Sequence, residues 1–218
     1  MARKKTVKKQ DLISMFMEYV LENDHLPKSV FSFAKENNFE EANFYEFFGS
    51  FEALEGAVFE TFFENTLQLL SKSEAYQDYD ARNKLLSFYF TFFELLTANR
   101  SYVVYAFNKG KNNLKSLQSL KGFHKHFKQF IDDLDIETLD IQQDQIEKFQ
   151  HKALQESAWV QLLVTMKFWL EDTSSSFEKT DIFIEKSVNT SFDLLDIKPL
   201  KSIIDFGKFL FKEKVLQK

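Results

Sequence analysis

The stretch FEEANFYEFFGSFEAL, residues 39–54, is the most informative part of this sequence. Its aromatic side chains predict a short helix over residues 40–48, followed by a Gly49-Ser50 turn and a long amphipathic helix that begins at Phe51. The segment before it, VFSFAKENN at residues 30–38, predicts another short helix, and Asn38 suits a left-handed position in the turn. Together these segments predict a helix, a tight turn and a second helix.

A further helix is predicted over residues 10–23. Leu12, Met15, Phe16, Tyr19 and Val20 recur at spacings of three and four, so they share one helix face. We therefore expect a small three-helix head over residues 1–50 and a larger helical body over residues 51–218.

The head resembles the DNA-binding head of TetR-family transcriptional regulators. The matching residues are Leu12-Ile13, Val30, Phe33-Ala34-Lys35, Phe44-Tyr45, Phe48, Ser50 and Glu52-Ala53-Leu54, within about the first 55 residues. Asn38 stands where the family has Gly, and Phe51 replaces the family's usual Lys. The resemblance implies a head that binds operator DNA, and a body that binds a ligand and forms a homodimer.

The resemblance also implies which head residues would meet DNA. They lie in a basic N-terminal arm, at the start of the second helix and on the third helix: Lys4, Lys5, Lys8, Lys9, Ser29, Asn43, Phe44 and Tyr45. The charge of the head opposes this function, because residues 10–50 carry two lysines and eight acids. Phosphate contacts by Lys or Arg supply much of the affinity for DNA, so the arm would have to compensate. The other interpretation of the arm, and the commoner meaning of such a run of charges, is a solvated tail.

Composition predicts an all-α fold for the whole chain. The 218 residues include only 5 Gly and 2 Pro, too few for the turns of a sheet-rich fold, and 27 Phe. The aromatic stretch LLSFYFTFFELL at residues 85–96 predicts a central helix. The predicted ligand pocket consists of Phe88, Tyr89, Phe92, Phe107, Phe127 and Trp169, although plain core packing is the other interpretation.

Residues 100–129 carry seven basic residues and no acid. This segment is either an ordinary solvated face or a cationic rim for an anionic amphipathic ligand or a membrane surface. Long helices are predicted over residues 143–170, 181–195 and 199–214. In the TetR family the two helices before the last one form a four-helix bundle across a two-fold axis, so the expected dimer residues are Val160, Leu163, Ile184, Val188 and Phe192.

Other classes of protein find no support in the sequence. There is no Cys, no Gly-rich phosphate loop and no HExxH sequence, and the four His residues are scattered. We expect no cofactor, no metal site and no enzymatic activity. No stretch is long and apolar enough for a membrane span, so we expect no stable membrane insertion and a cytoplasmic location.

Two functions remain open from the sequence. The first is a TetR-like, ligand-responsive transcriptional regulator that binds DNA as a dimer. The second is a lipid or isoprenoid carrier on the same fold, with a head that no longer binds DNA. The basic arm favours the first, whereas the acidic third helix, Phe51 and the basic residues 100–129 favour the second.

Overall fold

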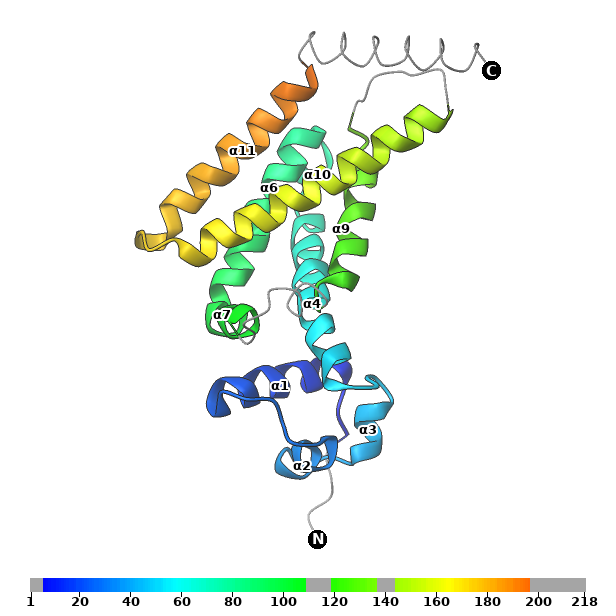
Figure 1. Ribbon diagram of the computed structural model, residues 1–218, viewed down its shortest axis with the longest axis vertical. Coiled ribbons are helices and arrows are strands. Elements are labelled where there is room, and N and C mark those ends of the chain that lie inside the picture. The colour runs from blue at the N-terminus through cyan, green and yellow to red at the C-terminus, as the bar shows by residue number, and fades with distance from the viewer. Residues whose placement is uncertain (1–5, 109–118, 137–143, 197–218) are drawn as a thin grey trace, which may run out of the picture. The chain divides into compact units, whose positions relative to one another are not determined.

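The computed structural model describes residues 6–108, 119–136 and 144–196, and every regular element in these ranges is helical (Figure 1). This confirms the predicted all-α fold. The α-helices are α1 (Lys9–Asn23), α2 (Val30–Glu36), α3 (Glu41–Tyr45), α4 (Phe51–Ser71), α5 (Glu74–Gln77), α6 (Ala81–Ala98), α7 (Arg100–Asn108), α9 (Lys121–Asp133), α10 (Asp144–Glu171) and α11 (Glu178–Asp196). The short 3-10 helix η1 (Ser175–Phe177) precedes α11.

The helices group into two compact units. One unit contains residues 1–72 and 91–127, and the other contains residues 73–90 and 128–218. Helices α6 and α9 therefore each contribute to both units, while α10 and α11 belong to the second. The boundary predicted after residue 50 separates a DNA-binding head from a ligand-binding body. It is a division by function rather than by compactness, and it stays a prediction.

The helix-turn-helix is built around the ring of Phe33. This ring is fully buried, and it contacts the rings of Tyr19, Phe39, Phe44 and Phe51 at centroid distances of 5.7–6.5 Å. Asn38 adopts the predicted left-handed conformation, with φ of 56°. The head therefore closes on itself through edge-to-face aromatic packing, which adds specific geometry to the burial of apolar area.

Helices α1, α4 and α7 meet at Tyr102. Its ring lies 6.5 Å from Phe16 and 6.4 Å from Phe59, and it is 1% exposed. The Tyr102 hydroxyl is buried and has no hydrogen-bond partner within the described residues. Burial raises the pKa of this hydroxyl, and the nearby charge of Glu55 raises it further. Tyr102 is thus a packed core residue whose hydroxyl makes no hydrogen bond within the described residues.

Replacing Tyr102 with Phe should leave the protein as stable as before or increase the free energy of unfolding by about 1 kcal/mol, because a buried hydroxyl without a partner costs about that much in lost hydration. Urea unfolding followed by circular dichroism measures this change. Tyr19→Phe, at a part-exposed site in the same unit, is the control. A loss above about 1 kcal/mol in Tyr102→Phe alone would reveal a hydrogen bond to this hydroxyl.

The start of α9 packs against α4. The Cβ of an alanine at position 56 would lie 3.4 Å from the Ser119 carbonyl oxygen, and one at position 122 would overlap the Glu60 carboxylate. One turn further along, Phe63 contacts Phe123 at 5.7 Å and stacks on His126. A larger residue at position 122 would therefore require the flexible Glu60 side chain to move.

The second unit has its own aromatic core. Phe88 of α6 lies 4.7 Å from Phe130 of α9, and both rings are buried. Helices α10 and α11 lie side by side and are joined by an elbow that contains η1 (Figure 1). Trp169 is fully buried there and contacts Phe177 at 6.0 Å.

Candidate functional site

The basic arm and the start of α2 carry the predicted phosphate contacts. Lys8 and Lys9 are exposed at the start of α1, whereas Lys4 and Lys5 lie outside the described residues. Ser29 is exposed and caps α2, since its hydroxyl accepts a hydrogen bond from the Ser32 backbone N–H at 3.1 Å. Ser29 thus orients the first turn of the helix-turn-helix.

The third helix presents Tyr45 but not Phe44. Tyr45 is 54% exposed, whereas Phe44 is 0% exposed. The Phe44 ring lies among those of Phe33, Phe48 and Phe51. The prediction that Phe44 contacts DNA is therefore wrong, because this side chain anchors α3 to the head. Asn43 is part-exposed, and its Nδ2 donates to Glu46 Oε1 at 3.2 Å.

The head surface differs from its predicted role in two further ways. Phe51 is part-exposed, and its ring packs against those of Phe16, Phe33 and Phe44, so the residue that replaces the family's Lys covers the core of the head. Phe31 and Phe47 are 61% and 42% exposed, although neither was predicted as a surface residue. The sequence feature that could have indicated their exposure is that each Phe lies off the periodic apolar face of its predicted helix.

The residues predicted to line a ligand pocket form packed core instead. Phe88, Tyr89, Phe92, Phe127 and Trp169 have no exposed surface. Phe107 is part-exposed and contacts Phe59 at 5.8 Å. The five buried residues therefore form packed core in this conformation, as the other interpretation of the sequence expects, and their role in ligand binding stays a prediction. Their rings contact other rings, so they leave no surface for a ligand in this conformation.

The basic residues of the segment 100–129 divide into different environments. Lys121 and Lys125 are exposed on α9, whereas Lys128 makes an ion pair with Glu156 of α10 at 2.8 Å. Lys109, Lys111 and Lys115 lie outside the described residues. Lys128 thus has a role within the protein, which weakens the prediction of a continuous cationic rim.

Two of the five predicted dimer residues lie inside the protein. Ile184 and Val188 are 0% exposed, so the prediction that they contact a partner subunit is wrong. Leu163 and Phe192 are part-exposed, and Val160 is 56% exposed. The face of α11 that the sequence suggested is the one that packs within the second unit.

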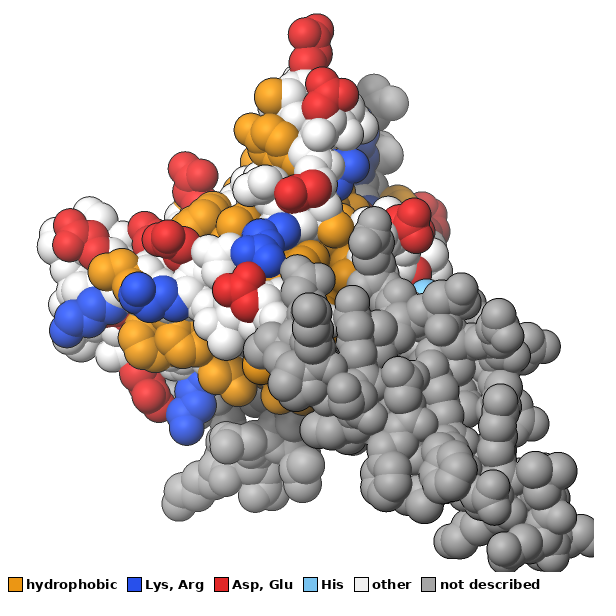
Figure 2. Space-filling model, turned by 90° about the horizontal axis from the view of Figure 1, so that it is seen from above, with side chains coloured by type: hydrophobic (Ala, Val, Ile, Leu, Met, Phe, Trp, Pro, Cys, Tyr) orange, Lys and Arg blue, Asp and Glu red, His pale blue; other side chains and the backbone are white. Residues whose placement is uncertain are grey.

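Helices α10 and α11 present a different apolar surface, which we call the α10–α11 face. Its exposed members are Val160, Val164, Ile182 and Leu194, each 50–56% exposed. Between the helices lies a groove of about 580 Å³ lined by Phe168, Lys179, Ile182, Phe183, Lys186, Ser187 and Thr190. Phe168 and Phe183 stack at 4.6 Å and join the two helices. Hydrophobic side chains also reach the surface among charged ones in the view of Figure 2.

The elbow between these helices is fixed by one buried carboxylate. Asp172 accepts hydrogen bonds from the backbone N–H and hydroxyl groups of both Ser174 and Thr180, at 2.7–3.0 Å. Burial alone would raise the pKa of Asp172, but these four bonds stabilise the charged form and hold the pKa well below its ordinary value. The elbow is therefore locked by a charged group, and this sets how α10 leads into α11.

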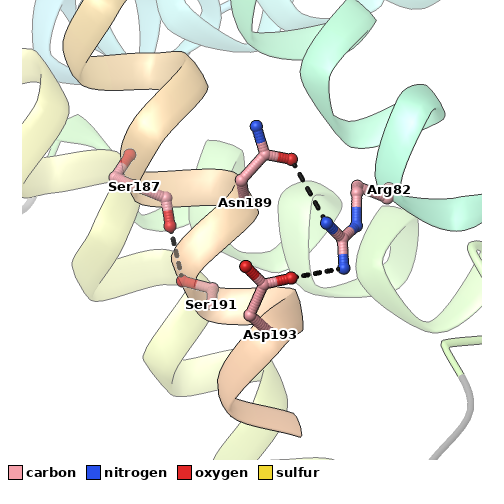
Figure 3. Close-up of polar contacts among 5 residues, drawn as sticks. All are labelled: Arg82, Ser187, Asn189, Ser191 and Asp193. Atoms are coloured by element: carbon pink, nitrogen blue, oxygen red, sulfur yellow. Dashed lines mark hydrogen bonds and ion pairs between the residues drawn. The ribbon is translucent and has the colours of Figure 1, made fainter. Parts of the chain in front are cut away.

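Polar contacts tie α11 to α10 and to α6. Gln161 of α10 bonds to Ser187 and Ser191, at 3.3 and 3.1 Å. Arg82 of α6 donates to Asp193 at 2.8 Å and to Asn189 at 3.4 Å, as Figure 3 shows. These contacts tie α11 to its two neighbouring helices, and Ser187 among them also lines the groove of the α10–α11 face.

One comparison with known proteins gives a match. Residues 84–210 match a family model described as "Tetracyclin repressor-like, C-terminal domain". No match to a curated protein was found. The matched region takes in most of α6 and all of the described chain after it.

Proposed function

Since the chain belongs to the TetR family through this C-terminal domain, we propose that it is a transcriptional regulator that binds DNA as a homodimer and responds to a ligand. The observation that carries the proposal is the joint presence of two family features. The head resembles the family over about the first 55 residues, and the family model covers residues 84–210. These two regions do not overlap, so each supports the assignment separately.

The proposed dimer forms through the α10–α11 face. Exposed Val160 and Val164 lie one turn apart on α10, while Ile182 and Leu194 extend the apolar surface along α11. An exposed apolar surface on two neighbouring long helices is suited to burial against the same surface of a second copy. This surface takes the place of the buried Ile184 and Val188 in our proposal.

The proposed DNA contacts come from the arm and the edge of the helix-turn-helix. Lys8 and Lys9, with Lys4 and Lys5, would supply positive charge, and Ser29 and Tyr45 would supply hydroxyl groups near the phosphates. Two heads of a dimer can bind together only when they match half-sites about 34–36 Å apart. A small rearrangement in the body would therefore suffice to release DNA.

The proposed effector is a small apolar or anionic amphipathic molecule. The support is compositional, because 27 Phe residues supply an apolar interior and the segment 100–129 is basic. The buried rings of α6 would have to separate to admit such a molecule. Native mass spectrometry of the purified protein tests this proposal by showing whether a lipid or other small molecule co-purifies with it.

A second candidate function rests on one observation, the acidity of α3 and its flanks. Residues 36–47 carry four glutamates and no basic residue. Such a surface repels phosphate, which favours a carrier of lipid or isoprenoid with a head that does not bind DNA. The two candidates differ in their response to DNA. Fluorescence anisotropy with the upstream duplex of the protein's own gene, against a scrambled duplex and across a salt series, separates them.

Replacing Lys8 and Lys9 with Glu should weaken DNA binding by at least about 100-fold, because up to four phosphate contacts of a dimer are lost and each adds about one unit to the salt slope. Folding should not change, since both side chains are exposed. The same anisotropy assay measures affinity and slope. Lys72→Glu with Lys84→Glu, outside the head, provides the charge-matched control.

An unchanged affinity in the Lys8→Glu, Lys9→Glu protein would exclude the arm as the anchor. Absence of binding by the unmodified protein, even at low salt, would favour the carrier.

We also propose a cytoplasmic, non-enzymatic role, as is usual for regulators of this family. Of the helices in the described ranges, none is long and apolar enough to cross a membrane.

A further inference from the structure

Arg82 and Asp193 each occupy a position that is unfavourable for their own helix. Arg82 is the second residue of α6, and the first turn of α6 contains no acid. Asp193 lies in the last turn of α11, which contains no basic residue. A helix carries partial positive charge at its N-terminus and partial negative charge at its C-terminus, so both side chains oppose the local dipole.

The two unfavourable charges compensate each other across 111 residues of sequence. Arg82 Nη2 lies 2.8 Å from Asp193 Oδ1, and Nη1 donates to Asn189 Oδ1 at 3.4 Å. The guanidinium also lies over the ring of Phe192, 5.4 Å from its centroid. Arg82 thus brings to the last turn of α11 the positive charge that this turn lacks. Its three contacts are with Asn189, Phe192 and Asp193, and Figure 3 shows the two polar ones.

These contacts hold the half of α11 that the elbow does not. The N-terminal end of α11 is fixed by Asp172, and its middle is fixed by buried Ile184 and Val188. The C-terminal half bears the exposed Leu194 next to Asp193, and Arg82 and Gln161 make polar contacts with it from other helices. Local preferences that conflict with the tertiary fold are expected where a function requires them.

We infer that Arg82 is the positioning residue of the dimer: it latches the C-terminal half of α11 against α6 and so sets the shape of the α10–α11 face. This inference rests on the proposed dimer. A face that is held in its bound shape loses less entropy on association, so the latch favours dimer formation without contacting the partner. The ion pair is partly exposed, at 32% and 64%, so salt weakens the latch.

The test uses Arg82→Asp, Asp193→Arg and the double variant that swaps the charges. Each single change relieves a dipole conflict but removes the ion pair, whereas the swap restores a pair of opposite charges. A dimer contains two latches, and losing each one should weaken the dimer by a few-fold. Each single variant removes both latches, so its dimer should be about 5- to 25-fold weaker than that of the wild type. Sedimentation velocity gives the Kd, and hydrogen exchange of the peptide over residues 187–196 should be about fivefold faster.

The charge swap should recover most of both effects. The matched control is the Lys128–Glu156 pair, which has the same 2.8 Å separation and similar exposure but lies between α9 and α10. Its reversal in Lys128→Glu should leave the Kd and the exchange of α11 unchanged.

The outcomes separate the latch from the dimer. A dimeric wild type whose Kd and exchange respond to neither single variant would overturn the latch alone, as would a swap that recovers neither. A wild type that stays monomeric at all concentrations would overturn the dimer and the role of Arg82 together.

Discussion

A protein that carries Val160→Glu and Val164→Glu should be a monomer at concentrations where the wild type is a dimer. Both valines are about half exposed, at 56% and 50%, and lie one turn apart on α10. In a two-fold dimer the change would place four carboxylates in an apolar contact. Burying charges without partners costs several kcal/mol, which corresponds to at least about a 100-fold weaker dimer.

The same substitutions should leave the fold of each subunit intact. Glutamate is a better helix former than valine, and neither position is buried in the subunit. Sedimentation velocity measures the oligomeric state, and circular dichroism measures the helix content and the thermal midpoint. Leu69→Glu, at a 45% exposed position on α4, controls for the loss of an exposed apolar side chain. If the double variant dimerises like the wild type, the interface lies elsewhere.

Local periodicity was sufficient to predict most of the helices. The predicted segment 10–23 differs by one residue at its start from α1 (Lys9–Asn23), and the segment 143–170 differs by one residue at each end from α10 (Asp144–Glu171). Asp80 precedes α6 and caps it, since its carboxylate accepts a hydrogen bond from the Asn83 N–H at 2.8 Å. Such features depend on residues within one or two turns of each other, which is the range over which sequence pattern is informative.

The choice between neighbouring apolar residues could not be made from pattern alone. Phe44 and Tyr45 are adjacent aromatics on a five-residue helix, too short for a period to show which one faces inward. On α11, Ile182 and Ile184 are both apolar, yet the first is 51% exposed and the second is buried. Apolar residues on two sides of a helix predict that both sides are in contact with other apolar surfaces. They do not indicate which side packs within the chain and which side meets a partner.

Contacts between distant segments could not be predicted from sequence for a different reason. The Arg82–Asp193 pair joins positions 111 residues apart, and neither residue belongs to a recognisable motif. The available signal was negative, a charge at the wrong end of each helix. Likewise, Phe51 could be recognised as a departure from the family, but its packing against Phe16 depends on the approach of α1 and α4.

Phe92→Ala should lower the free energy of unfolding by about 3–5 kcal/mol, the usual cost of removing a buried aromatic side chain from a core that cannot collapse. Phe92 has no exposed surface, and its ring lies 5.2 Å from Phe123 and 5.9 Å from Phe93. Urea unfolding measures the loss. Phe90→Ala on the same helix is the matched control, because Phe90 is 40% exposed and should cost less than about 1 kcal/mol.

The size of this loss also decides how an apolar ligand could enter the body. A full loss means that Phe92 fills a packed core, so a ligand must displace side chains and its affinity is reduced by the energy of that rearrangement. A loss no larger than that of Phe90→Ala would contradict the packing described for α6 and would return Phe92 to the wall of a cavity. In that case a lipid that co-purifies with the protein should bind against Phe92. Adding this lipid should stabilise the wild type against urea more than it stabilises the Phe92→Ala protein.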